Sequence, residues 1–170
     1  MITRGALSLA LALMLTATGC SSGESAEAYF SSLETVAGTL ASELDDLEGE
    51  FNAGLLGIDF SVPGSEEALI DVFQKAITGT ADAFADFAAG IDLLEPPADL
   101  EAPHADALRA GLRVREEYSR RVEELTATAS LDDIAGFAEA VSAARRRYTE
   151  SCRELQTIAE AESIDVDLGC

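Results

Sequence analysis

The sequence predicts an all-α fold: an antiparallel up-down-up-down four-helix bundle with a short C-terminal tail that is stapled by a disulfide. Apolar residues recur every three or four positions through four long segments, the spacing that gives a helix one apolar face. Short stretches rich in turn-forming residues separate these segments, and short links favour antiparallel neighbours. The chain shows no useful length of the alternating pattern that is typical of strands.

The first helix is expected over residues 25–51. Its apolar residues step by four and three along about seven turns: Ala26, Phe30, Leu33, Ala37, Leu40, Leu44, Leu47 and Phe51. A loop follows over residues 52–64, where turn formers interrupt the pattern: Asn52, Gly54, Gly57, Pro63 and Gly64. The loop also carries apolar side chains over 55–62, which suggest a plug over one end of the bundle or an exposed lip of a binding site.

The second helix is expected over residues 66–94. Ser65 suits the N-cap position, and the acidic Glu66 and Glu67 would follow it in the first turn. Pro96 ends this helix, because proline disfavours helical backbone in the residue before it.

The third helix is expected to begin between residues 98 and 104 and to end near residue 127. Its apolar face is the poorest of the four. Ser130 and Asp133 resemble a capping box, which predicts the start of a fourth helix that runs to about residue 162. No linker divides the chain, so residues 26–170 are expected to form a single domain.

Residues 1–19 have the features of a secretory signal peptide. Arg4 supplies the positive charge, residues 6–15 form an apolar run, and the small residues 16–19 follow. The apolar run is too short to span a bilayer in a finished protein. We therefore expect this segment to be cleaved.

The sequence Ala17-Thr18-Gly19-Cys20 resembles the cleavage motif of bacterial lipoproteins, although that family usually has leucine where this chain has Ala17. The resemblance implies that the thiol of Cys20 carries a diacylglycerol group and its new amino terminus a third acyl chain such as palmitate. Two or more chains hold a protein stably on a membrane. Residues 20–25 would then be a lipidated tether.

The same resemblance implies a location on the extracytoplasmic face of the cell membrane, or in the outer membrane if the source has two membranes. The alternative is an ordinary cleaved signal peptide with a free cysteine nearby. If Cys20 is lipidated, we expect the membrane to be reached through this lipid and not through a spanning helix.

The chain is strongly acidic. It has 32 acidic and 11 basic residues, a formal net charge of −21, and Lys75 is the one basic residue between Cys20 and His104. This charge repels phosphate backbones and anionic membranes, so nucleic acid is not an expected partner. It suits either a basic protein partner or plain solubility.

Cys152 and Cys170 are predicted to form a disulfide. A secreted protein sits in an oxidising compartment, and eight extended residues can fold back the roughly 15 Å from the end of the fourth helix. The alternatives are two free thiols or a bond from Cys170 to another chain. Two cysteines alone do not make a metal site, which needs further ligands.

No motif in the sequence supports catalysis or a bound cofactor. Nucleophile elbows, phosphate loops, dinucleotide fingerprints and zinc motifs are missing, and no catalytic, cofactor-binding or metal-binding residue is assigned. His104 is the single histidine, and we expect it to be a surface or capping residue. The chain is therefore predicted not to be an enzyme.

The candidate contacts for a ligand or partner lie in the last two helices: Arg115, Tyr118, Tyr148, Arg145, Arg146 and Arg147. One helical register of the third helix places Arg115 on the seam, the line along which the helices contact each other. A buried arginine there would need a carboxylate or an anionic ligand to balance its charge. The three consecutive arginines could match the acidic helices or dock an acidic partner.

Two functions follow from these observations. The first is a non-enzymatic interaction or structural role for a lipid-anchored acidic helical bundle. The second is ligand binding, in a pocket between helices near Arg115 or under the 55–62 loop.

Overall fold

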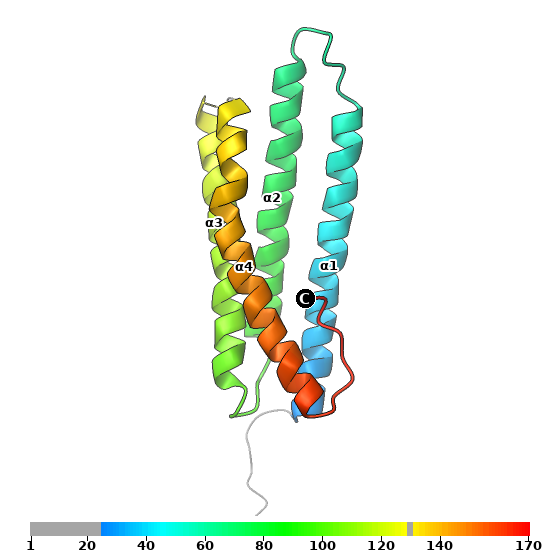
Figure 1. Cartoon of the computed structure of the whole chain (residues 1–170), viewed down its shortest axis with the longest axis vertical. Coiled ribbons are helices and arrows are strands. Elements are labelled where there is room, and N and C mark those ends of the chain that lie inside the picture. Colours follow the sequence, from blue (N-terminus) through cyan, green and yellow to red (C-terminus); the bar gives the residue numbers. More distant parts are fainter. Residues whose placement is uncertain (1–24, 129–130) are drawn as a thin grey trace, which may run out of the picture.

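A computed structural model of the chain describes residues 25–128 and 131–170, and the side chains of these residues outside 126–140. It contains four helices and, within the described residues, no strand: α1 (Ala26–Leu56), α2 (Ser65–Asp92), α3 (Glu101–Thr128) and α4 (Leu131–Ala161) (Figure 1). The all-α class is thus confirmed. The expected signal peptide, Cys20 and the cap at Ser130 and Asp133 lie outside what the structure describes.

Helix α1 continues to Leu56, whereas the sequence pattern predicts an end at residue 51. The extension packs closely against α2. A Cβ atom at Gly54 would lie 3.0 Å from a methyl group of Val72, and the rings of Phe51 and Phe73 meet edge to face with their centroids 5.0 Å apart. This packing outweighs the weak helix propensity of glycine.

The link between α1 and α2 places Gly64 at the N-cap of α2, so the prediction of Ser65 as the cap was wrong. Gly64 has φ of 92° and no side-chain hydrogen bond caps the helix, while Ser65 is the first helical residue. Glycine suits this left-handed backbone because it has no Cβ atom to clash.

Neighbours in sequence are also neighbours in space. Helix α1 packs along α2, α2 along α3 and α3 along α4, and α2 also touches α4 over a short stretch. These contacts are consistent with the expected bundle. The first residue of α1 and the last turns of α4 lie at one end of the molecule, and the α1–α2 link lies at the other (Figure 1).

The described core is concentrated toward the end of the molecule that holds the start of α1. In α1 the buried residues run from Tyr29 to Leu40, and in α2 they begin at Ile77. Beyond these points the apolar residues of the two helices are half-buried or exposed. Among the described residues, the half that holds the start of α1 is therefore closed, and the other half is less completely packed.

The C-terminal tail lies between α1 and α4 in the closed half. The sulfur atoms of Cys152 and Cys170 lie at disulfide distance, as the sequence predicts, with Cα atoms 5.8 Å apart. Leu168 is buried in the core. Its amide donates to Oε1 of Gln156 on α4 at 3.0 Å, and the amide of Asp167 donates to Oε1 of Glu34 on α1 at 2.8 Å. The tail thus joins α1 to α4.

Candidate functional site

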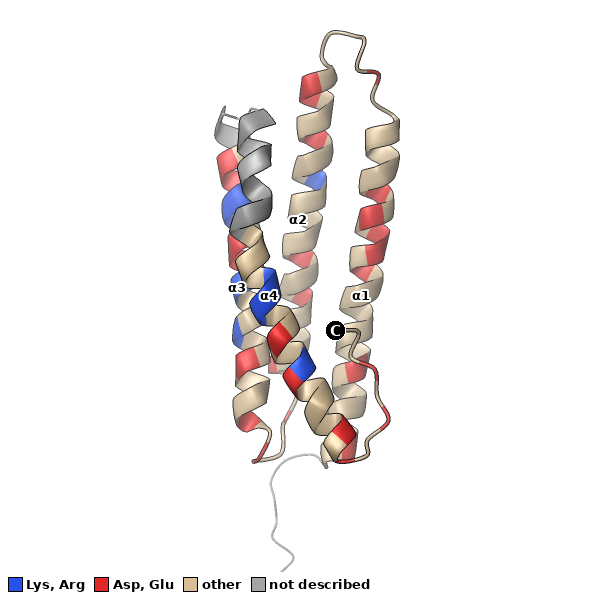
Figure 2. Ribbon diagram, in the orientation of Figure 1, with Lys and Arg blue, Asp and Glu red and all other residues tan. Residues whose placement is uncertain are grey.

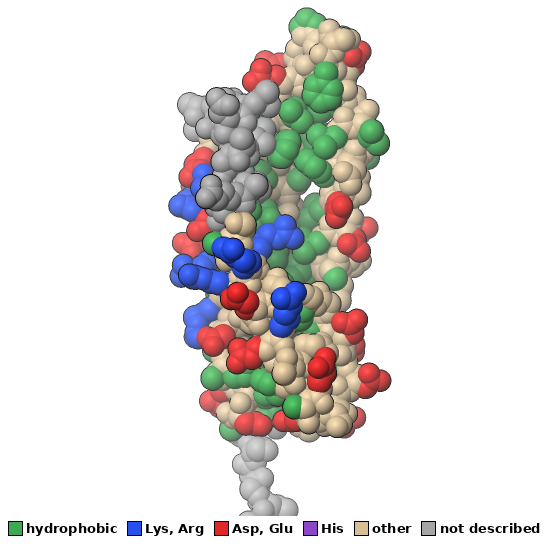
Figure 3. Space-filling model, viewed as in Figure 1, with side chains coloured by type: hydrophobic (Ala, Val, Ile, Leu, Met, Phe, Trp, Pro, Cys, Tyr) green, Lys and Arg blue, Asp and Glu red, His purple; other side chains and the backbone are tan. Residues whose placement is uncertain are grey.

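An open groove of about 520 Å³ follows α1 and α2 beyond the buried core. Hydrophobic side chains are visible along it between the two helices in Figure 3. Its apolar walls come from both helices: Ala41, Leu44, Leu47, Phe51, Phe73, Ala76 and Ile77. Thr80 and Gly169 complete the lining together with the four charged or aromatic residues described below.

Tyr118 of α3 and Arg145 of α4 line this same groove. Burial raises the pKa of Tyr118, and the positive charge of Arg145 opposes that rise. The structure thus brings together two of the side chains that the sequence suggested as contacts, although they lie 27 positions apart.

Two carboxylates of α1, Asp45 and Glu48, also line the groove. They belong to an acidic stretch of α1 that has no basic residue between positions 41 and 51: Glu43, Asp45, Asp46, Glu48 and Glu50. Figure 2 shows these acidic residues along the middle of α1. The groove is therefore apolar inside, with an acidic rim along α1.

Arg115 does not lie on the seam, so the helical register that would place it there is wrong. Its side chain is exposed, and the neighbouring Val114 is fully buried instead. The buried face of α3 includes Ala107, Val114 and Tyr118, which places Arg115 about 100° away from Val114 on the helix surface. A one-residue shift in register accounts for the error.

Tyr148 is half-buried and packs against the core. Its ring meets Phe84 and Phe87 edge to face, with centroid distances of 5.1 Å and 5.3 Å. Burial raises the pKa of Tyr148 to about 12. The ring lines an apolar cavity of only about 10 Å³, which leaves no room for a ligand larger than a single water molecule.

The three consecutive arginines do not act as one patch. Arg145 lines the groove, Arg147 lines a separate charged cleft, and Arg146 is exposed and lines neither. Successive helical residues point about 100° apart, which explains this separation.

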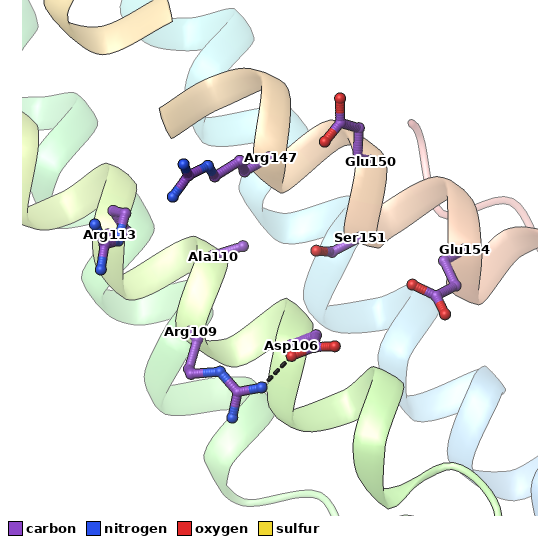
Figure 4. A pocket seen from close by; sticks show the side chains of 8 residues that line it. All are labelled: Asp106, Arg109, Ala110, Arg113, Arg147, Glu150, Ser151 and Glu154. Carbon is purple, nitrogen blue, oxygen red and sulfur yellow. Dashed lines mark hydrogen bonds and ion pairs between the residues drawn. The ribbon is translucent and has the colours of Figure 1, made fainter. Parts of the chain in front are cut away.

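The charged cleft lies between α3 and α4 and has a volume of about 420 Å³ (Figure 4). Arg113 and Arg147 extend into it from the two helices, and Arg109 forms an ion pair with Asp106. Glu150 and Glu154 also line it. Acidic and basic groups both line this exposed cleft, so it selects no single class of ligand.

His104 is buried, not at the surface as the sequence suggested. Its Nδ1 atom lies 3.3 Å from the hydroxyl oxygen of Tyr29 on α1. Burial lowers the pKa of His104, and the nearby Asp92 partly opposes this shift. Burial also raises the pKa of Tyr29 to about 12. The pair is a polar contact inside the core, and it joins α1 to α3.

Within the part of the chain that the structure describes, no group of three or more histidine, cysteine, aspartate or glutamate residues is placed to hold a metal ion. None of the described helices is long and apolar enough to cross a membrane. Searches for similar family models, curated proteins and solved structures returned no match to the chain.

Sequence reasoning assigned the groove residues Leu44, Leu47 and Phe51 to the core, because they continue the apolar spacing of α1. Two signals could have indicated otherwise. The acidic stretch begins at the same point of α1, and the third helix has too few large apolar residues to cover a seam of this length. Gly169 was missed because its place depends on how the tail folds back.

Proposed function

We propose that this chain is a lipid-anchored extracytoplasmic lipoprotein with a non-enzymatic role, and that it binds a partner at the groove beside α1 and α2. The groove is the observation that carries this proposal. It leaves a continuous row of apolar side chains of α1 and α2 only half-buried in a strongly acidic chain, and contiguous accessible apolar surface of this kind marks binding sites. Its volume lies within the range of known ligand sites.

The proposed architecture is an antiparallel up-down-up-down bundle whose tail is stapled to α4. In this arrangement the tether would join α1 at Ala26, at the end remote from the α1–α2 link. The groove begins near Ala41 and extends to Phe51, which is about 20 to 40 Å from Ala26 along the helix. The groove would therefore lie some distance from the membrane that holds the lipid.

The anchor is tested by Cys20→Ala in the full chain. Cells that are fed an alkyne analogue of palmitate should label the wild-type protein, and the variant should lose this label and stay uncleaved. Cys152→Ala is the matched control and should keep the label. Full labelling of Cys20→Ala would overturn the assignment of Cys20.

The role of the groove is tested by photo-crosslinking in intact cells. Benzoylphenylalanine at Ala41, which lines the groove, is compared with the same residue at Ser42, which is exposed beside it and does not line the groove. We expect a discrete protein adduct from position 41 that is absent at position 42. Equal adduct patterns at the two positions would contradict a groove-specific partner.

A second candidate function is binding of a small apolar ligand in the same groove. The observation that favours it is the position of Tyr118 and Arg145, whose polar groups could orient a ligand within an apolar wall. This version keeps the predicted class of function but places the ligand along α1 and α2, because neither Arg115 nor any residue of 55–62 lines the groove.

A further inference from the structure

The groove continues the line along α1 that the C-terminal tail covers in the closed half of the molecule. In the closed half, the tail lies between α1 and α4 and buries Leu168 there. Gly169 lies at the point where the filled part of the seam meets the open groove. Beyond Gly169 the apolar lining continues along α1 and α2 without a covering segment among the described residues.

The size of the groove fits one apolar face of a short helix. A cavity of about 150 Å³ holds one benzene ring, so about 520 Å³ holds roughly three large apolar side chains. The groove follows α1 from Ala41 to Phe51, about 15 Å. Anchors at positions i, i+4 and i+7 of a helix span about 10 Å and fit within that length.

The charge around the groove selects a basic partner. Asp45 and Glu48 line it, three more carboxylates lie on the same stretch of α1, and Arg145 is the one basic residue in the described lining. Its single positive charge is outnumbered by the carboxylates of this stretch. An acidic partner would therefore meet repulsion along α1, whereas lysine or arginine side chains could extend from the apolar contact to the acidic rim.

We propose that the groove binds a basic amphipathic helix of a partner protein, with apolar side chains between α1 and α2 and basic side chains against Asp45 and Glu48. This inference rests on the proposed function, because it requires that the groove is a binding surface. It adds the chemical class and the secondary structure of the partner.

The test uses the full chain in phosphatidylcholine nanodiscs, with empty nanodiscs as the blank. The first probe is a fluorescent peptide of about 18 residues, or five helical turns, with leucine on one face and lysine elsewhere. A second peptide has the same composition in scrambled order, and a third has glutamate in place of lysine. Fluorescence anisotropy at low salt should show binding of the first peptide at least about tenfold tighter than of the other two.

Two pairs of variants locate the binding. Ala41→Phe places a ring in the groove and should abolish binding, while Ser42→Phe, one residue away and outside the groove, should leave binding unchanged. Asp45→Asn combined with Glu48→Gln should weaken binding about five- to tenfold at low salt. Asp82→Asn combined with Asp86→Asn, which removes two exposed carboxylates of α2 outside the groove, should weaken it less than twofold.

Equal binding of the scrambled or the glutamate peptide would overturn the basic-helix inference, as would equal weakening by the Asp82 and Asp86 control. The neutral dye Nile red separates this failure from that of the proposed function. If no peptide binds but the dye binds and is excluded by Ala41→Phe, the groove is a small-ligand site and the helix inference is wrong. If neither peptide nor dye binds, both the inference and the groove-based function are wrong.

Discussion

The hydroxyl oxygen of Tyr29 and Nδ1 of His104 lie 3.3 Å apart in the core, although 75 positions separate them in the chain. Tyr29 is fully buried and His104 is 9% exposed. Each side chain gives the other a hydrogen-bond partner inside an apolar environment, where an unpaired polar group is costly. This contact ties the first turns of α1 and α3 together.

We predict that His104 makes the protein less stable as the pH falls. The folded state lowers the pKa of His104 below its ordinary value of 6.5. Between pH 6.5 and the folded-state pKa, the unfolded chain binds a proton that the folded chain does not, so stability falls with pH in this window. At higher pH the residue is neutral in both states and contributes no slope.

The measurement compares thermal midpoints of the wild type and His104→Gln between about pH 7.5 and pH 5. Because the many carboxylates titrate similarly in both proteins, the difference between the two curves isolates His104. The wild type should lose stability relative to the variant as the pH decreases. A constant difference across the range would contradict the shifted pKa.

The bond between Cys152 and Cys170 is predicted to stabilise the fold by about 3 kcal/mol, since it closes a loop of 18 residues. Cys170→Ser tests this with little damage, because Cys170 is exposed and Cys152 can remain as a small buried thiol. Urea unfolding should show the loss. The same midpoint for the variant and the wild type under oxidising conditions would argue against the bond.

Gln156 should hold the tail independently of that bond. Its Nε2 donates to the carbonyl of Val166 at 3.0 Å and its Oε1 accepts from the amide of Leu168 at 3.0 Å. Gln156→Ala removes both hydrogen bonds and should cost about 1 to 3 kcal/mol in urea unfolding. Gln156→Glu keeps the acceptor and loses the donor, so a cost equal to that of alanine would contradict separate roles for the two bonds.

Two helical glycines are predicted to respond in opposite ways to alanine. A Cβ atom at Gly90 would lie 2.9 Å from a methyl group of Val36, a stiff β-branched side chain, whereas a Cβ at Gly38 has nothing within 4 Å. Gly90→Ala should therefore destabilise the fold by about 1 to 3 kcal/mol. Gly38→Ala should stabilise it by about 0.5 to 1 kcal/mol. Shifts of the same sign in thermal unfolding would show that the α1–α2 contact is looser than described.

The α1–α2 link is predicted to contribute little to stability. Leu56 is 89% exposed and Phe60 is 66% exposed, so the expectation of a plug over one end of the fold was wrong. Phe60→Ser should change the free energy of unfolding by less than about 0.5 kcal/mol. Phe84→Ala, in the core, should cost about 3 to 5 kcal/mol. A large loss from Phe60→Ser would mean that the link packs against the helices.

The helical class, the four helices with most of their ends, and the pairing of Cys152 with Cys170 could all be predicted from the sequence. These features depend on local periodicity, on turn-forming residues and on the small number of cysteines, all of which can be read along the chain. The predicted end of α1 at residue 51 was wrong. Gly54 is only a weak indication that a helix ends, and the close contact of this segment with Val72 of α2 outweighs it.

Which apolar residues are covered could not be predicted from the sequence, because it depends on contacts between distant segments. Leu40 and Leu44 occupy the same stripe of α1, yet Leu40 is buried and Leu44 lines a groove, because among the described residues the tail packs against only the first part of the helix. Contacts between distant segments also explain why His104 is buried and Arg115 is exposed, contrary to what the sequence suggested. Periodicity reports which face of a helix is apolar, whereas burial depends on what the rest of the chain places against that face.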